Sequence, residues 1–356
     1  MSTSFYSLQI KSIEKTTADA VCIEFDVPEI LQSNFNFEAG QYLTLKAHIN
    51  GVETRRSYSL CSAPSSKTWK VGIKKVTNGL FSSFANDELK VGDSLEVMPP
   101  MGKFKVPHCE ENANIVFFAA GSGITPILSQ IKEILETQPR TSCTLVYSNP
   151  SKNSIMFKEE LEALKDKYLQ RLRLIHLLSR EKTDSPLHFG RIDQEKLSTL
   201  FKHLLPKDAT AYMICGPEEM ILATKEYLQE IGIPPAKVMF ELFGTSAGKT
   251  KQSSAKKSEA AKAGSLVTLI MDGRSVEMNV AFDDQTILDV ALEKGADLPY
   301  ACKGGVCCTC KAKLIEGEVE MEVHYGLEQD EIEHGYILTC QSRPLTETVV
   351  IDFDAK

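Results

Sequence analysis

A run of cysteines near the C-terminal end constrains this chain more than any other feature. Residues 302–310 read C-K-G-G-V-C-C-T-C, and one more cysteine follows at position 340. The spacing C-x4-C-x2-C…C is typical of four thiolates that bind a [2Fe-2S] cluster, and glycines in a short loop let backbone amides approach the sulfides. The spacing therefore predicts four ligands: Cys302, Cys307, Cys310 and Cys340.

Structural zinc is the alternative use of four cysteines. Zinc sites usually combine two separated C-x2-C pairs, whereas here one tight loop carries three of the thiols. The cluster is therefore preferred, and Cys308 is interpreted as a spare thiol. With this loop, the last quarter of the chain resembles the plant-type ferredoxins. The resemblance implies a small α+β domain of the β-grasp type over residues 265–356.

The chain as a whole has the composition of an ordinary globular protein. Of the 356 residues of the whole chain, 42% are hydrophobic and 25% are charged. No run approaches the ~18 apolar residues of a membrane helix, and the N-terminus lacks the pattern of a signal peptide. We therefore expect a cytoplasmic protein without a membrane partner. The other cysteines are scattered rather than arranged as a disulfide framework, and four are interpreted as small buried hydrophobic residues: Cys22, Cys61, Cys109 and Cys143.

Charge is distributed unevenly along the chain. Residues 265–356 carry 7 Lys and Arg against 18 Asp and Glu, whereas residues 1–264 carry 33 against 30. An acidic C-terminal domain argues against a nucleic-acid partner and favours a protein with a basic surface, with simple solubilisation as the alternative. The acidic residues nearest the cysteine loop and Cys340 are Glu316, Glu318, Glu320, Glu322, Glu328, Asp330, Glu331 and Glu333.

Residues 1–107 read as short strands separated by turns. Apolar and polar side chains alternate over residues 43–49, as in a half-buried strand. Turn residues occur at Gly40, at Asn50-Gly51 and at Gly92-Asp93. This pattern predicts a small antiparallel barrel.

Three runs within this barrel resemble the flavin-binding signatures of the ferredoxin–NADP reductase superfamily: R-S-Y-S-L at 56–60, G-I-K at 72–74 and G-L-F-S at 79–82. The resemblance implies that Arg56 pairs with a flavin phosphate, that Tyr58 stacks on the isoalloxazine and that Ser59 lies near the flavin N5. The helix that starts at 79–82 offers free amides to a pyrophosphate, which favours FAD over FMN. The other implied flavin residues are Gly72, Ile73, Lys74, Gly79, Phe81 and Ser82.

Residues 108–244 alternate between strands and helices, which predicts βαβ units around a parallel sheet. An apolar run at 115–120 leads into G-S-G-I-T-P at 121–126, where two glycines let the backbone approach a pyrophosphate at a helix N-terminus. This run and C-G-P at 215–217 match the same superfamily. The matches imply that a nicotinamide nucleotide is bound by Gly121, Gly123, Thr125, Pro126, Cys215, Gly216 and Pro217, with Cys215 lining the nicotinamide side rather than acting as a nucleophile.

The nucleotide's phosphate end is indicated by S-R-E at 179–181, which resembles the run that holds the 2′-phosphate of NADP in plant-type reductases. Ser179 and Arg180 therefore favour NADPH, with NADH as the alternative. The run S-N-P at 148–150 departs from the G-N-R expected for the family. Where the sheet ends, at 240–244, the resemblance adds Glu241 and Phe243 as residues near the flavin.

A stretch rich in Lys, Ser and Ala at 245–264 reads as a flexible linker that could span roughly 25 Å. The order of barrel, nucleotide domain, linker and ferredoxin domain resembles the reductase components of bacterial multicomponent oxygenases. It implies that electrons pass from NADPH through FAD and the cluster to an oxygenase component with a di-iron centre, without a catalytic acid or nucleophile in this chain. The alternatives are a reductase for another hydroxylase, dioxygenase or desaturase, and a zinc-bearing binding module.

Overall fold

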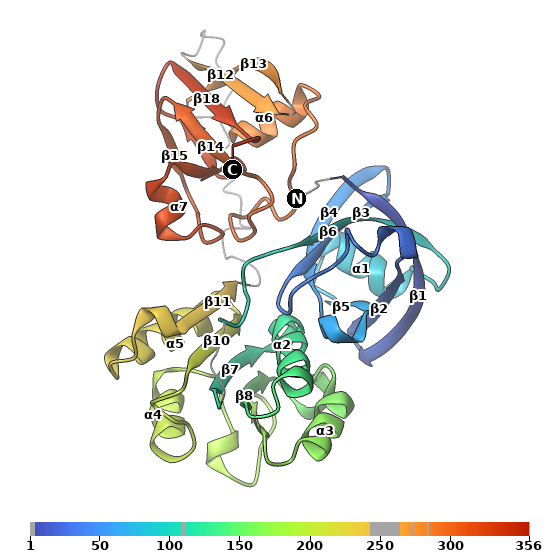
Figure 1. Ribbon diagram of the computed structural model, residues 1–356, viewed down its shortest axis with the longest axis vertical. Coiled ribbons are helices and arrows are strands. Elements are labelled where there is room, and N and C mark those ends of the chain that lie inside the picture. The colour runs from blue at the N-terminus through green and yellow to red at the C-terminus, as the bar shows by residue number, and fades with distance from the viewer. Residues whose placement is uncertain (1–3, 108–111, 243–263, 272, 283–284, 356) are drawn as a thin grey trace. The chain divides into compact units, whose positions relative to one another are not determined.

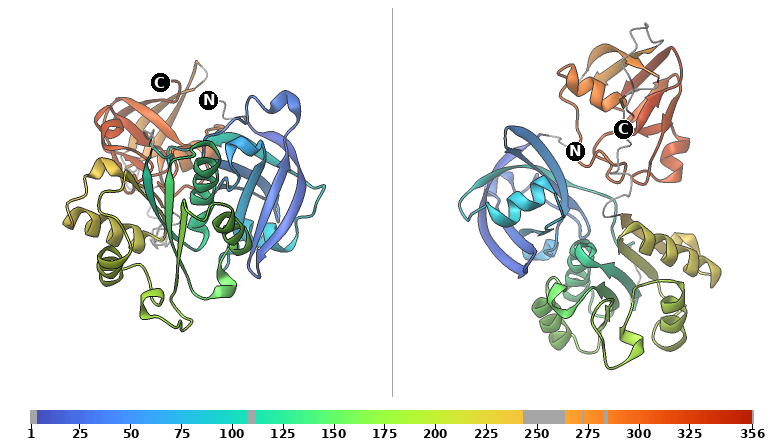
Figure 2. Two further views of the ribbon diagram at one scale, coloured as in Figure 1. Left: turned by 60° about the horizontal axis from the view of Figure 1, so that its bottom comes forward. Right: turned by 180° about the vertical axis from the view of Figure 1, so that it is seen from behind.

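The computed structural model describes residues 4–107, 112–242, 264–271, 273–282 and 285–355 (Figures 1 and 2). The chain divides into two compact units, Met1–Phe243 and Gly244–Lys356. None of the helices in these ranges is long and apolar enough to cross a membrane. The expected cytoplasmic location stays a prediction.

The first unit begins with a six-stranded antiparallel sheet in the order β4-β3-β6-β1-β2-β5. A bridge between Leu60 and Val71 joins the two edges, so the sheet closes into the predicted barrel. The alternation over residues 43–49 buries its apolar members in the barrel core, but Thr44 is buried too, with its hydroxyl 3.3 Å from that of Ser57. The elements are β1 (Tyr6–Thr17), β2 (Ala20–Asp26), β3 (Tyr42–Ile49), β4 (Val52–Ser59), β5 (Trp69–Lys74), α1 (Leu80–Asp87) and β6 (Ser94–Met101).

A five-stranded parallel sheet follows in the order β11-β10-β7-β8-β9, as predicted. The chain order reverses between β7 and β10, and α/β folds bind ligands at the carboxyl ends of such strands. The elements are β7 (Asn114–Ala120), η3 (Gly121–Gly123), α2 (Ile124–Thr137), β8 (Ser142–Asn149), η4 (Lys152–Ser154), α3 (Lys158–Lys167), β9 (Leu172–Leu178), η5 (Pro186–His188), α4 (Gln194–His203), β10 (Ala211–Gly216), α5 (Glu218–Glu230) and β11 (Val238–Leu242).

The barrel and the parallel sheet share one hydrophobic core within the first unit. Ala20, Cys22, Cys61 and Phe104 of the barrel belong to the same buried cluster as the apolar face of α2, which lies between the two parts in Figure 1. Polar contacts fix this arrangement, since Ser129 Oγ donates to the Ser62 carbonyl at 2.6 Å. Cys22, Cys61 and Cys143 are buried as predicted, while Cys109 lies outside the described residues.

The second unit contains a five-stranded sheet in the order β13-β12-β18-β14-β16, in which β12 and β18 are parallel. Helix α6 packs onto its core, and this confirms the predicted β-grasp arrangement. The predicted linker, 245–264, lies outside the described residues except for Gly264, and the domain boundaries stay predictions. The elements are β12 (Gly264–Met271), β13 (Arg274–Ala281), α6 (Ile287–Glu293), β14 (Lys311–Glu316), β15 (Val319–Met321), α7 (Gln329–Glu333), β16 (Tyr336–Leu338), β17 (Ser342–Pro344) and β18 (Thr348–Asp352).

Candidate functional site

The four predicted cluster ligands come together in the second unit. Cys302, Cys307 and Cys310 lie on the loop between α6 and β14, and Cys340 lies in the turn between β16 and β17. The sulfurs of Cys302 and Cys307 are 3.1 Å apart. Contact with Cys307 and Cys340 lowers the pKa of the Cys302 thiol, while contact with Cys302 raises the pKa of both Cys307 and Cys340. Cys310 also contacts Cys340, so the four sulfurs lie close together.

Glycines give this loop its shape. The Gly304 amide donates to the Cys302 sulfur at 3.3 Å. A Cβ on Gly305 would lie 2.5 Å from the Val323 carbonyl oxygen, and one on Gly326 would lie 2.7 Å from that of Cys307. An amide donor and four converging thiols fit a [2Fe-2S] cluster, which takes two thiolates on each iron. Among the residues the structure describes, no group of three or more candidate ligands is arranged around a single metal ion.

The flavin candidates on β4 and at the start of α1 lie close together. The Tyr58 ring on β4 lies 5.6 Å from that of Phe81 on α1, and burial raises the pKa of Tyr58. Arg56 is exposed beside it. Gly79 precedes α1, and Ser82 Oγ donates to the Gly79 carbonyl at 3.2 Å, so this hydroxyl shapes the turn at the helix start.

Two flavin candidates serve the packing of the first unit. Ile73 is fully buried in the barrel core. Gly72 faces the parallel sheet, since a Cβ there would lie 2.7 Å from Thr125 Cγ2 and 2.9 Å from the Phe157 ring. Gly72 is therefore required for the close approach of barrel and nucleotide domain. Their neighbour Lys74 instead lines a cavity at the carboxyl ends of the parallel strands.

Ser59, Cys215 and Glu241 meet where the barrel adjoins the parallel sheet. Ser59 Oγ donates to Glu241 Oε2 at 3.3 Å, and Glu241 is the register partner of Cys215. Desolvation raises the pKa of the Glu241 carboxyl to about 8, and burial raises the pKa of Cys215. Burial therefore favours the protonated form of both groups, which argues against Cys215 as a thiolate nucleophile. Phe243 lies outside the described residues.

A cavity of about 640 Å³ opens at the carboxyl ends of β7, β8, β9 and β10. Six sequence candidates line it: Lys74, Gly121, Ser179, Arg180, Gly216 and Pro217. Gly121 has a φ of +54° and nothing near its missing side chain, so its backbone faces open space. This cavity has the position and the residues expected of the nicotinamide nucleotide site.

The other candidates of this turn lie behind the cavity and support it. Thr125 and Pro126 are buried in the first turn of α2, and Thr125 Oγ1 donates to the Ser122 carbonyl at 3.1 Å. Gly123 is buried where a Cβ would lie 2.2 Å from the Cys215 carbonyl oxygen. Gly123 therefore lets the turn pack against β10, a role different from the predicted approach to a pyrophosphate.

Several polar residues of this cavity were not predicted as site residues: Ser122, Ser148, Asn149, Arg191, Asp193 and Glu219. Asn149 lines it and is 2% exposed, and within the described residues neither polar atom of its amide has a hydrogen-bond partner. Arg191 lines the cavity together with Arg180. Asn149 is the one residue of S-N-P at 148–150 that agrees with G-N-R, and it was not interpreted as a site residue; no sequence motif contains Arg191.

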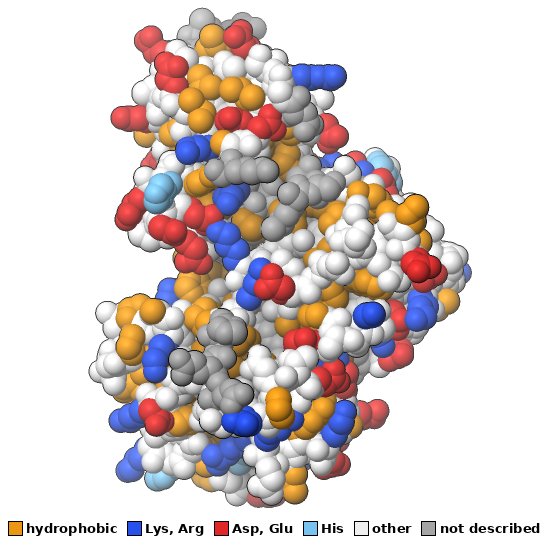
Figure 3. Space-filling model, viewed as in Figure 1, with side chains coloured by type: hydrophobic (Ala, Val, Ile, Leu, Met, Phe, Trp, Pro, Cys, Tyr) orange, Lys and Arg blue, Asp and Glu red, His pale blue; other side chains and the backbone are white. Residues whose placement is uncertain are grey.

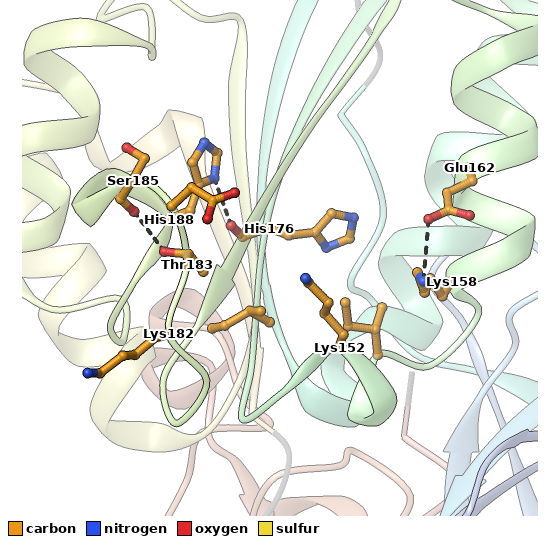
Figure 4. Close-up of a pocket in the computed structure, with 11 residues that line it drawn as sticks. Lys152, Lys158, Glu162, His176, Lys182, Thr183, Ser185 and His188 are labelled. Carbon is orange, nitrogen blue, oxygen red and sulfur yellow. Dashed lines mark hydrogen bonds and ion pairs between the residues drawn. The ribbon is translucent and has the colours of Figure 1, made fainter.

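A second hollow, of about 550 Å³, lies between α3, β9 and the residues that follow β9 (Figure 4). Two of its lysines form ion pairs that offset their positive charge: Lys158 with Glu162 at 3.8 Å, and Lys152 with Glu181 at 3.8 Å. Burial lowers the pKa of His176, which favours its neutral form. The cavity with two arginines is therefore the better candidate for the nucleotide site.

Known families match three consecutive stretches of the chain. They are an oxidoreductase FAD-binding domain at 7–106, an oxidoreductase NAD-binding domain at 117–226 and a 2Fe-2S iron-sulfur cluster binding domain at 269–345. Together with the fold and the site, they define an NAD(P)H-dependent oxidoreductase that carries electrons on FAD and a [2Fe-2S] cluster.

Among relatives, a subunit of the 1,2-phenylacetyl-CoA epoxidase of Escherichia coli (strain K12) is 45% identical over 99% of both chains. The ferredoxin reductase component of 3-ketosteroid-9-alpha-monooxygenase from Rhodococcus rhodochrous is 34% identical over 97% of this chain and 96% of that one. The structure of phthalate dioxygenase reductase matches 98% of both chains with a TM-score of 0.60 and 26% identity. This chain belongs to the family of reductase components of multicomponent oxygenases.

Three sequence runs resemble the reductase subunit of a phenylacetyl-CoA epoxidase in particular, and the identity of 45% confirms that resemblance. The runs are V-M-P-P-M-G-K-F at 97–104, G-S-G-I-T-P-I-L-S at 121–129 and F-E-L-F-G-T at 240–245.

Proposed function

We propose that this chain delivers electrons from NADPH to the oxygenase component of a phenylacetyl-CoA epoxidase in aerobic phenylacetate catabolism, in the cytoplasm. The observation that carries this proposal is the identity of 45% along the whole chain, against 34% for a reductase of another oxygenase. The acceptor in this proposal is a di-iron centre.

We assign each group of residues a role from its place in the structure. Cys302, Cys307, Cys310 and Cys340 hold the cluster. Arg56 and the amides at the start of α1 hold the flavin phosphates, and Tyr58 packs against the ring system. FAD held there would supply the conversion between two-electron hydride chemistry and the one-electron chemistry of the cluster.

Ser59 and Glu241 stand at the proposed meeting point of flavin and nicotinamide. Because the pKa of Glu241 is about 8, its carboxyl is neutral below that pH and places no negative charge where a hydride passes. Ser59 orients this carboxyl through their hydrogen bond. The proposed role of Ser59 is to position the Glu241 carboxyl, and that of Glu241 is to keep this place uncharged.

The preference for NADPH is proposed from the two arginines of the nucleotide cavity. An arginine fork suits a phosphate dianion, and Ser179 and Arg180 are anchored to the end of β8 by backbone hydrogen bonds to Asn149 and Pro150, each 2.9 Å. Arg180→Ala should raise the KM for NADPH about 10-fold or more, because it removes a charge-assisted hydrogen bond of about 1.5–3 kcal/mol. The KM for NADH should change little.

Steady-state kinetics with both nucleotides measure this effect, with Arg173→Ala as the matched control. Arg173 is an exposed arginine on β9 whose guanidinium donates to the Leu204 carbonyl at 2.9 Å. Equal losses with NADPH and NADH in Arg180→Ala would mean that Arg180 does not contact the 2′-phosphate.

The proposed docking surface is the acidic face of the second unit, where many acidic side chains are visible (Figure 3). Glu316, Glu318, Glu320, Glu322, Glu328, Asp330 and Glu333 are exposed. Glu331 differs, because its side chain is 11% exposed, pairs with Lys311 at 2.9 Å and forms a capping box with Glu328 at the start of α7. Glu320 and Asp330 are therefore better positions for charge reversal.

Stopped-flow reduction of the purified di-iron component tests both partner and surface. Clustered charge of one sign raises the rate of encounter. We expect partner reduction to slow about tenfold or more between about 0.1 and 1 M salt, as the screening length falls from roughly 10 to 3 Å. Transfer from NADPH to FAD should change little.

The double variant Glu320→Lys/Asp330→Lys should also slow partner reduction at low salt. If the di-iron component accepts no electrons at any salt concentration, the proposed partner is wrong. If it is reduced but neither salt nor charge reversal matters, docking uses another surface.

A further inference from the structure

The segment that carries Cys340 is attached to the cysteine loop on both sides of this residue. Before it, Thr339 is fully buried, and both its amide and its hydroxyl donate to the Cys310 carbonyl, at 3.2 and 3.1 Å. After it, Gln341 reaches the opposite end of the loop. The fourth ligand therefore lies between two contacts to the segment that carries the other three.

The side-chain amide of Gln341 joins the first ligand to the fourth. Its Nε2 donates to the carbonyl of Lys303, which follows Cys302, at 3.0 Å, and to the carbonyl of Cys340 at 2.9 Å. Gln341 also packs against the loop, because a Cβ on Gly305 would lie 3.0 Å from its Cγ. One NH₂ group thus fixes the separation of the backbone at two ligands.

Lys303 is held from the other side as well. It has a φ of +53°, which is unusual for a residue other than glycine. Its Nζ lies 2.7 Å from Asp289 Oδ1 on α6 and 4.8 Å from the centre of the Tyr300 ring. Asp289 Oδ2 in turn accepts from Thr286 Oγ1 at 2.9 Å. The loop conformation after Cys302 is therefore anchored to the first turn of α6.

We propose that Gln341 and the ion pair of Lys303 and Asp289 form a positioning layer that sets the separation of the first and fourth cluster ligands and the reduction potential of the cluster. Groups around metal ligands orient them, and charge near an iron–sulfur cluster tunes its potential. This inference rests on the proposed ligand set.

The test uses the purified full-length protein with its cluster. Gln341→Met keeps the side-chain length but removes both donors, and the cluster absorption should be lost to a chelator about 10-fold faster. Gln341→Glu adds a negative charge next to the cluster, and Asp289→Asn removes one. Redox titration monitored by EPR should show a lower potential for Gln341→Glu and a higher one for Asp289→Asn.

The matched control is Gln329→Met, because Gln329 lies on α7 and donates to the exposed Glu333 at 3.2 Å. It should leave potential and chelator resistance unchanged. The proposal is overturned if Gln341→Met keeps its cluster as long as the wild type, or if the two charge variants do not shift the potential in opposite directions. Asp289 is partly exposed, so its variant gives a potential even if the Gln341 variants fold poorly. An incorrect assignment of the four ligands would give a different result, because Cys307→Ser would then keep its cluster.

Discussion

Cys307→Ser is expected to abolish the transfer of single electrons to any acceptor that depends on the cluster. Cys307 is 6% exposed, and its sulfur lies 3.1 Å from that of Cys302, where the four sulfurs lie close together. A serine there removes one of two thiolates from an iron. Reduction of ferricyanide by NADPH at the flavin should continue, because the barrel and nucleotide cavity belong to the other unit. Visible absorption and EPR measure the cluster, and ferricyanide assays measure the flavin.

Cys308→Ser is the matched control for this loss. Cys308 is the next residue in the same loop but is partly exposed, and the spacing leaves it outside the ligand set. The variant should keep cluster absorption and electron output close to those of the wild type. A cluster lost in Cys308→Ser and kept in Cys307→Ser would show that the ligand register is displaced by one residue.

Gly123→Ala should damage the nucleotide site without touching a ligand. The added Cβ would lie 2.2 Å from the Cys215 carbonyl oxygen and 2.8 Å from the Gly216 amide nitrogen, so backbone must move. Overpacking of this kind typically lowers the free energy of unfolding by about 1–3 kcal/mol. A displacement of roughly 1 Å at the nicotinamide would slow hydride transfer by about 100-fold. Denaturant unfolding and stopped-flow reduction of FAD measure the two effects.

Gly232→Ala controls for the general cost of losing a glycine. Gly232 has a φ of +83°, and nothing lies within 4 Å of the position that its Cβ would take. The substitution should cost roughly 1–2 kcal/mol of backbone strain and leave hydride transfer unchanged. Normal hydride transfer in Gly123→Ala would show that the turn and β10 can separate without moving the nucleotide.

Most of the fold could be predicted from the sequence, because a short pattern of neighbouring residues marks each element. Apolar runs such as 115–120, alternation over 43–49 and the cysteine loop each occupy one short stretch, and the structure contains the elements they predict. The nucleotide cavity was predicted less completely, since it is assembled from the ends of several strands. Arg191 follows a loop that no motif marks, and it reaches the cavity only because β9 and the residues after it fold beside β8.

Individual roles were also harder to predict than positions. Gly121 and Gly123 look alike in sequence, but the first faces the cavity and the second packs against β10. Glu331 resembles its acidic neighbours, yet its carboxylate is occupied by Lys311 and the capping box. Such differences depend on contacts between residues distant in the chain, which spacing alone does not contain.

The buried cluster shared by the barrel and α2 decides which parts of this reductase can be separated or exchanged with those of other reductases. Because Cys22, Cys61 and Phe104 are buried together with residues of the parallel sheet, a chain cut near residue 107 would expose apolar surface on both fragments. Residues 1–243 should accordingly melt in one cooperative transition, and chimeras should exchange the flavin and nucleotide parts only as a block. The iron–sulfur unit has its own hydrophobic core, so it is the part that can be transplanted between reductases.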